Sequence, residues 1–497
     1  MARKSTALLL ALGLILGLAG CSSQDAQSES DQNTSDATDI ALSDDGVTVD
    51  GEDAPTDAQS AVYVGADIVY YQSGQDESYG DGTEDDAHSA EEAAAHTVVT
   101  ITQPGTYRVS GTLSAGQIAV DLGEDASQDP DAVVDLILDN ADITCTVAPA
   151  IIFYNVYECG STNADTASGT VDTSAAGANV TLAEGSTNTV TGSHVAQIYQ
   201  EGTMDKLHKY DGALYSKMSM NIDGAGSLSI VADNEGLCSE LHLTINGGNI
   251  DISSQNDGIN TNENGVSVTT INDGTLHING GLGTEGDGID SNGFITINGG
   301  EVYTMSKDNG ADGGIDADES ITINGGTLIA LGSRNDIVDS SSGQPYMDLQ
   351  FASVCAAGST VSIQNENGEE IISFTAEKSF QSLTLSSPEL ALDTVYSVYV
   401  DDVQQQYTAT GTANFGAPPA DGQPPQDDGT PPDGESPSNG EASSDSEEPV
   451  SDSDAPSEND DNQTSQGGDL SQSKPSSSFV LTEENKSFSG ISAVEAQ

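Results

Sequence analysis

LTINGG at residues 243–248 recurs downstream as TTINDG (269–274), ITINGG (295–300) and ITINGG (321–326). Its central isoleucine, Ile245, is followed by three equivalents at a constant step of 26 residues. A fixed period of roughly 20–50 residues is typical of stacked structural repeats. The phrase therefore predicts a repeat architecture, in which each copy occupies the same place in successive coils of the chain.

Each 26-residue unit has the pattern of three short strands. Apolar and polar residues alternate with period 2, and glycines end each run, which favours strands over helices. In the first unit the Thr-Ile-Asn phrase is followed by Ile250 and Ile252, and then by the step Gly258-Ile259. We expect an all-β parallel β-helix with three strands per coil, in which each coil buries its apolar residues against the next. The asparagine after each central isoleucine, first Asn246, is expected to form a stacked amide ladder with a structural role.

The rest of the chain divides by composition into segments around this array. We expect a signal peptide over 1–20 and a flexible acidic tether over 21–95. The β-helix should span 96–345, and a small β cap over 346–411 should cover its last coil and so protect an open sheet edge. Residues 412–497 are rich in proline, serine and acidic residues, which predicts a disordered tail.

The first residues have the sequence pattern of a signal peptide for export. Arg3 and Lys4 precede the apolar run 7–18, which is followed by Leu-Ala-Gly-Cys ending at Cys21. This ending resembles the lipobox of bacterial lipoproteins, and the resemblance implies cleavage before Cys21 and a lipid on its sulfur. An ordinary secretory signal is the alternative. The expected location is the extracellular face of the cell membrane, with the lipid as the membrane anchor.

The composition restricts the partners. The chain has 81 acidic and 11 basic residues, so nucleic acid, which requires a basic face, is excluded as a partner. Such a charge attracts cations and repels acidic polymers unless a cation bridges them. Tryptophan is absent, so tyrosines would have to stack on sugar rings. The four cysteines after Cys21 permit three disulfide pairings.

Acidic and amide side chains gather beside the third strand. Aligning the coils on this strand places one apolar residue per coil in a column: Leu214, Leu237, Ile259, Ile289, Ile315 and Ile337. Oxygen-bearing side chains flank this column, and stacking would bring them to roughly 5 Å from one another. Carboxylates this close repel one another, and a hard cation bound between them would offset the repulsion. Ca²⁺ accepts irregular oxygen sites and is the expected ion. The predicted cation ligands are Asp257, Asn260, Asp287, Asp290, Asp312, Asp316 and Asp318. A solvated acidic face without bound metal is the alternative.

Residues 206–332 resemble a family of bacterial, clostridial-type cell-surface proteins described as carbohydrate-binding, calcium-binding parallel β-helices. The matching stretches are LHKYDGALYSK (207–217), NEGLCSELHLTINGG (234–248), NDGINTNENGVSVTTINDGTLHINGG (256–281), GDGIDSNG (286–293) and, earlier, ITQPGTYRVSGTL (101–113). The resemblance implies a right-handed β-helix similar to pectate-lyase folds, several bound Ca²⁺ ions and binding of a cellulose-like or acidic plant polysaccharide. The chain departs from the pattern at Cys238 and Val338, where neighbouring coils carry Asp or Asn.

Three functions fit these features. The first is a lipid-anchored surface protein that binds polysaccharide through calcium, with Tyr210, Tyr215 and Lys217 as candidate sugar contacts, although local packing is an equal explanation for them. The second is a calcium-dependent polysaccharide (pectate) lyase, for which Lys217 and Lys307 are the basic candidates; neither lies in a catalytic motif, and we assign no catalytic residue. The third is a structural adhesin without affinity for glycans.

Overall fold

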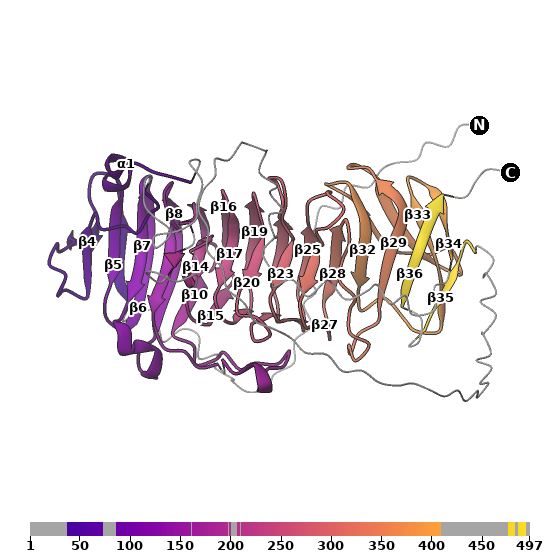
Figure 1. Ribbon diagram of the computed structural model, residues 1–497, viewed down its shortest axis with the longest axis horizontal. Helices are drawn as coiled ribbons and strands as arrows, with labels where there is room; N and C mark the ends of the chain where they lie inside the picture. Colours follow the sequence, from indigo (N-terminus) through magenta and orange to yellow (C-terminus); the bar gives the residue numbers. More distant parts are fainter. Residues whose placement is uncertain are drawn as a thin grey trace, which may run out of the picture.

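The computed structural model shows an elongated stack of strands that ends in a separate group of strands at its C-terminal end (Figure 1). The structure describes residues 37–72, 86–160, 162–196, 198–199, 206–208, 210–408, 476–482 and 486–493. The predicted signal peptide and the lipidation site at Cys21 lie outside these residues. The regular secondary structure of the described residues is almost entirely strand, with one five-residue α-helix, α1 (Ala90–Ala94), and two short 3-10 turns. The expected all-β fold class is therefore confirmed.

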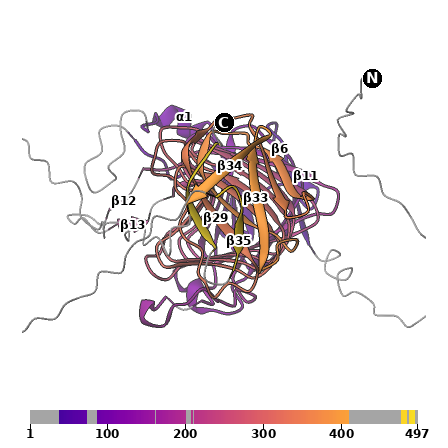
Figure 2. The same cartoon turned by 90° about the vertical axis from the view of Figure 1, so that its right-hand side faces the viewer.

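Parallel strands stack in three ladders, and the chain passes through one strand of each ladder in turn (Figures 1 and 2). The first-strand ladder contains β10 (Ala178–Leu182), β15 (Met220–Gly224), β18 (Leu243–Ile245), β21 (Val268–Ile271), β24 (Phe294–Ile297) and β27 (Ser320–Ile323). The second-strand ladder contains β11 (Thr187–Gly192), β16 (Ser227–Ala232), β19 (Asn249–Ser254), β22 (Thr275–Asn279), β25 (Glu301–Met305) and β28 (Thr327–Gly332). The third-strand ladder contains β9 (Ile151–Asn155), β14 (Gly212–Ser216), β17 (Glu235–Ser239), β20 (Ile259–Thr261), β23 (Ile289–Ser291) and β26 (Ile315–Ala317).

The register of these ladders follows the repeat. Ile245 pairs with Ile271, the next central isoleucine along the chain, and the pairing continues to Ile323. In the third-strand ladder Leu237 pairs with Ile259 in the same way. All of these side chains are fully buried. Identical residues therefore meet in one core along the whole stack, as the period of 26 predicts.

The turn after each first strand requires glycine. Gly274 has φ 108°, a conformation that other residues rarely adopt, and a Cβ there would lie 3.0 Å from the Gly248 carbonyl oxygen. The preceding asparagines form the expected amide ladder. Asn272 donates to Asn246 Oδ1 at 2.8 Å, and the next two asparagines continue the series with distances of 2.9 Å.

Replacing Asn298 by alanine is expected to lower the free energy of unfolding by about 1–3 kcal/mol. The substitution removes two ladder hydrogen bonds, one donated to Asn272 and one accepted from Asn324, each worth about 0.5–1.5 kcal/mol. Denaturant unfolding measures the loss. The exposed Glu301→Ala variant on the neighbouring strand is the control and should change stability by no more than about 0.5 kcal/mol. If Asn298→Ala lowers the free energy of unfolding no more than the control does, the asparagine ladder does not stabilise the fold.

The N-terminal end of the stack begins within the segment predicted to be a flexible tether. Strand β1 (Thr38–Leu42) pairs in parallel with β6 (Gly105–Leu113), and β4 (Val62–Gly65) pairs antiparallel with β5 (Thr97–Ile101). Ile40 and Leu42 are buried in the main core. The prediction of a tether over 21–95 is therefore wrong for these strands. Further apolar residues of this acidic segment, Val47, Val62 and Ile68, are buried in the same core.

The cap covers the last coil with antiparallel strands around its own apolar core. Strand β32 (Phe380–Ser386) pairs antiparallel with β28 and with β29 (Tyr346–Cys355), and β33 (Thr394–Val400) pairs with β30 (Thr360–Asn365). Here the parallel order of the stack ends.

The cap also contains strands from the segment predicted to be a disordered tail. β35 (Phe479–Leu481) pairs with β33, and β36 (Ser487–Ala493) pairs with β29 and β34 (Val403–Thr408) (yellow in Figure 1). Phe479, Leu481 and Phe488 are buried in the cap core. The prediction of disorder over 412–497 is therefore wrong for these two strands, because their apolar residues complete the cap.

The third-strand ladder stops one coil earlier than the alignment predicts. Ile337 is 45% exposed, and the neighbouring Val338 forms a parallel bridge with Ile321 of the first-strand ladder. The chain is already leaving the regular array at this point.

The described cysteines are all free thiols: Cys145, Cys159, Cys238 and Cys355. None of the possible disulfide pairings is formed among them. Within the described part of the chain, no helix has the length and apolar character required to cross a membrane.

Candidate cation site

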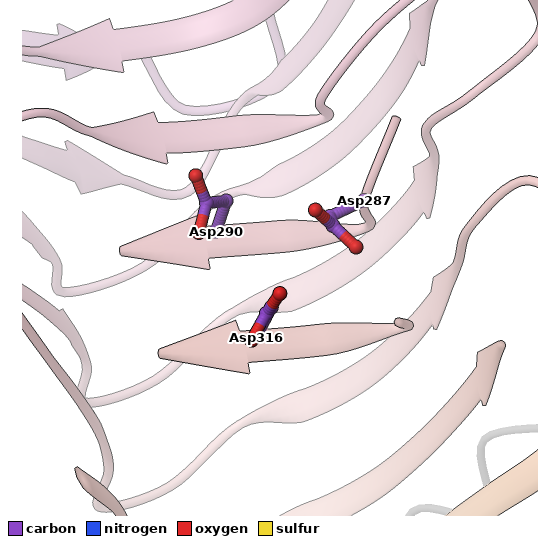
Figure 3. Close-up of side chains that lie close together, drawn as sticks. All are labelled: Asp287, Asp290 and Asp316. Carbon is purple, nitrogen blue, oxygen red and sulfur yellow. The ribbon is translucent and has the colours of Figure 1, made fainter. Parts of the chain in front are cut away.

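Three carboxylates converge on the outer side of the third-strand ladder (Figure 3). Asp290 on β23 is in register with Asp316 on β26, and Asp287 lies just before β23. One oxygen from each of the three lies within 4.8 Å of the others. We call these residues the carboxylate cluster. Sequence reasoning placed all three among the cation ligands, and the parallel register brings them together.

Glycine lets neighbouring coils approach closely beside this cluster. A Cβ on Gly258 would lie 2.2 Å from Ile278 Cγ2 and 2.6 Å from the Gly288 carbonyl oxygen, so no larger residue fits before this third strand. This close approach also lets backbone N–H groups of one coil donate hydrogen bonds to aspartates of the neighbouring coil. The backbone N–H of Asp287 donates to Asp257 Oδ1 at 2.7 Å, and the N–H of Gly313 donates to Asp287 Oδ1 at 2.5 Å.

Asn260 extends the cluster by one coil. It pairs with Asp290 in the ladder and is only 5% exposed. Its Nδ2 donates to Glu235 Oε1 at 2.9 Å and to Asp257 Oδ2 at 3.4 Å. Its Oδ1 is buried and accepts no hydrogen bond from the described residues. Because buried polar atoms normally have a partner, this oxygen is available to a ligand such as a cation.

Burial and mutual repulsion raise the pKa values of the cluster. Burial raises the pKa of Asp287 to about 9, with the charges of Asp257 and Asp316 as further causes. Burial, followed by the hydrogen bond and charge of Asp336, raises the pKa of Asp316 to about 8. The pKa of Asp290 is raised well above its ordinary value, mainly by burial and then by the charges of Asp257 and Asp287. Without a counter-cation the cluster therefore holds protons at neutral pH.

The other predicted ligands lie at its margin. Asp312 Oδ2 accepts hydrogen bonds from the Gly286 N–H at 2.6 Å and from Asn309 Nδ2 at 2.7 Å. Asp318 is exposed. At the level of Cys238 the ladder offers a thiol in place of an oxygen, and Asn262 Nδ2 lies 3.2 Å from that sulfur. The oxygen ligands thus concentrate in the coils from β20 to β26.

The predicted sugar-contacting tyrosines are inside the protein. Tyr210 is 4% exposed, and Tyr215 is fully buried. The Tyr210 ring makes edge contacts with Tyr154 and Tyr215, each with a centroid distance of 5.4 Å. The Tyr215 hydroxyl donates to Glu240 Oε1. Their rings therefore serve local packing and present no face to a sugar, whereas Lys217 is half-buried.

Two further acidic residues border the cluster. Glu235 accepts from Asn260, and Asp336 lies against Asp316. Glu235 lies two residues before Leu237, as Asp257 lies two residues before Ile259, so the repeat places both in one row. Asp336 follows the last repeated phrase, where no periodicity marks its position.

Comparison with known proteins places the chain in a family. The family model for "Carbohydrate-binding domain-containing protein" matches residues 95–394. A "Carbohydrate-binding domain-containing protein" of Acetivibrio thermocellus is 32% identical over 158 residues, which are 31% of this chain and 45% of that protein. The match therefore spans about half the length of this curated relative. A solved structure of a polysaccharide lyase-like protein from C. thermocellum aligns with a TM-score of 0.34 and 23% identity, over 58% of this chain and 92% of that one. The chain belongs to the family of carbohydrate-binding domain-containing proteins.

Proposed function

We propose that the chain is a lipid-anchored cell-surface protein that binds polysaccharide through Ca²⁺ held at the carboxylate cluster. The observation that carries this proposal is the convergence of Asp287, Asp290 and Asp316 within 4.8 Å on a protein of a carbohydrate-binding family. The fold that we propose is a right-handed parallel β-helix, and its three parallel ladders support that description.

The donor atoms fit calcium. The three carboxylates and the buried Asn260 Oδ1 are all oxygen ligands, which hard cations prefer. The backbone of the stack sets the positions of these carboxylates, and Ca²⁺ accepts irregular oxygen sites, whereas Mg²⁺ demands a near-ideal octahedron. Asp287, Asp290 and Asp316 would hold the ion, with Asp257 and Asn260 beside it. The ion would supply positive charge that offsets the repulsion among these groups.

A cation at this place also explains how so acidic a protein would bind an acidic glycan. The net charge of −70 repels uronate polymers. Calcium between the cluster and a uronate carboxylate would replace that repulsion with attraction. The Leu-Ala-Gly-Cys ending at Cys21 supports attachment to the extracellular face of the membrane through a lipid.

Binding of polygalacturonate in calcium and in chelator tests the proposal. We expect retention of the full chain with calcium, loss of retention in chelator, and a loss on the order of tenfold in affinity for Asp290→Asn, because calcium affinity depends on the number of charged ligands. Asp273→Asn removes the same charge from an exposed turn and is the matched control. Retention that is indifferent to calcium, or an equal loss in both variants, would contradict the proposal. The appearance of an ultraviolet-absorbing unsaturated product would show a lyase instead.

A further inference from the structure

We propose that a second groove, on the first-strand ladder, binds a neutral polysaccharide chain without calcium. An insertion loop, residues 162–177, leaves the array between β9 and β10 and runs along the outside of the stack (purple, at the lower edge of Figure 1). Figure 2 shows the same segment outside the stack in the end-on view. Between this loop and the ladder lies a cavity of about 620 Å³. This site is separate from the carboxylate cluster. The proposal shares with the proposed function only the membership of a carbohydrate-binding family, and it does not require calcium at the cluster.

The loop is fixed to the ladder at two points that are several coils apart. Near its C-terminal end the Thr173 hydroxyl lies 2.7 Å from both Asn221 Oδ1 and Thr244 Oγ1, and Asn221 Nδ2 donates to the Thr173 carbonyl oxygen at 2.8 Å. Further along the stack, Thr296 Oγ1 donates to the Gly169 carbonyl oxygen at 2.5 Å. The attachments lie on β15, β18 and β24, so the loop forms a wall along four successive strands of this ladder, β15 to β24.

The floor consists of two rows of polar side chains that run along the stack. The inner row follows the register of the ladder and contains Asp135, Asn179, Asn221, Thr244, Thr270 and Thr296. The outer row lines the same cavity and contains Thr181, Asp223, Asn246, Asn272, Asn298 and Asn324. Because strands in a ladder lie about 4.8 Å apart, each row repeats at that interval. This is close to the length of one sugar unit, so a linear chain could meet equivalent groups in successive coils.

Thr270 points to a ligand most directly. It lies between Thr244 and Thr296 in the inner row and is only 7% exposed. The hydroxyls of its two neighbours are used by the loop: Thr244 by Thr173, and Thr296 by Gly169. Among the described residues, nothing forms a hydrogen bond with the Thr270 hydroxyl. The rest of the side chain is packed, but its hydroxyl oxygen opens into the groove and is available to a ligand there.

The chemistry of the lining favours a neutral glycan. Hydroxyls and amides both donate and accept hydrogen bonds, as sugar hydroxyls do. Asn272 uses one amide hydrogen in the ladder, which leaves a second for a ligand. The lining contains the acidic residues Asp135, Asp172 and Asp223 but no lysine, arginine or histidine, so an anionic chain would be repelled. Val171 and the threonine methyl groups supply the apolar contact that the C–H faces of a sugar require.

Retention of the full chain by neutral glucans, measured in chelator, tests this site. Hexasaccharides of β-linked and of α-linked glucose are the soluble probes, and polygalacturonate is the anionic comparison. We expect wild-type protein to bind at least one neutral probe in chelator and to bind polygalacturonate only with calcium. Thr270→Val keeps the side-chain shape but removes the hydroxyl, and should weaken neutral binding about three- to tenfold. Thr270→Tyr fills the groove and should abolish it.

Thr322→Val is the matched control, because Thr322 continues the inner row one coil beyond Thr296 and does not line the cavity. It should bind as wild type does, and the melting temperatures of the three variants check the fold. Neutral binding that is absent in wild type, unchanged in Thr270→Tyr, or equally weakened in Thr322→Val would overturn the proposal. Loss of calcium-dependent polygalacturonate binding alone would overturn the function of the carboxylate cluster and leave this groove standing.

Discussion

Replacing Phe488 by alanine is expected to lower the free energy of unfolding of the cap by about 3–5 kcal/mol. The side chain is 1% exposed in the cap core. Its ring lies 3.9 Å from that of Phe479 and 5.4 Å from that of Tyr407, measured between centroids. A smaller residue would leave a cavity at the point where β36 meets Leu349 of β29. Because the chain contains no tryptophan, tyrosine fluorescence during denaturant unfolding reports the loss.

Val480→Ala is the matched control for this effect. Val480 lies on β35 between two buried residues but is itself 43% exposed, so its truncation should change stability by no more than about 0.5 kcal/mol. If Phe488→Ala unfolds at the wild-type denaturant concentration, the C-terminal strands do not belong to the cap core.

Calcium is expected to reverse part of the pH dependence of stability. In the protein without calcium the pKa of Asp287 is about 9, whereas an aspartate in an unfolded chain titrates near pH 4, at about 3.9. Between these values the folded state holds a proton that the unfolded state has lost. The stability associated with this proton is fully present below about pH 3.9 and is lost as the pH rises through about 9. In chelator, the melting temperature should therefore fall between pH 5 and pH 8.

Calcium binds the ionised cluster, so its stabilisation should grow over the same pH interval. At a concentration 100 times its dissociation constant, it should add about 2.7 kcal/mol. Melting curves at pH 5 and pH 8, with calcium and with chelator, measure both effects. A wild-type protein that melts at the same temperature in calcium and in chelator at pH 8 would contradict the cation site.

Asp287→Asn separates the cluster from the general acidity of the chain. Asparagine keeps an acceptor for the Gly313 N–H but cannot ionise. In chelator at pH 8 the variant should melt above wild type, and it should gain less from calcium. Asp273→Asn again removes one exposed charge and should show neither change. Equal behaviour of the two variants would assign the pH dependence to net charge alone.

Much of the stack and of the carboxylate cluster could be predicted from the sequence. A period of 26 residues leaves one register in which every central isoleucine meets another, and Ile245, Ile271 and Ile297 do so. The same register places Asn260, Asp290 and Asp316 in one row. Side-chain direction then follows from strand alternation.

Two predictions, the sugar contacts and the last member of the apolar column, were wrong because they were based on residue type and did not include the surrounding side chains. Tyr210 and Tyr215 resemble sugar contacts in composition, but both are buried in an aromatic group with Tyr154. Ile337 fits the apolar column, yet the chain has begun to leave the array there, and Val338 takes the buried position. A single apolar residue in an irregular segment does not specify which ladder it joins.

The sequence by itself determined the repeating ladders, their register and the column of carboxylates, because these depend on contacts between residues one period apart. Only the tertiary structure decided what lies against the stack. The contact between Gly169 and Thr296 joins residues 127 apart, and that between Asp348 and Ser487 joins residues 139 apart. Neither pair belongs to the period, so no pattern marks them. They form because the insertion loop has hydrogen-bond partners on the ladder, and because the last strands bury the apolar side chains that complete the cap.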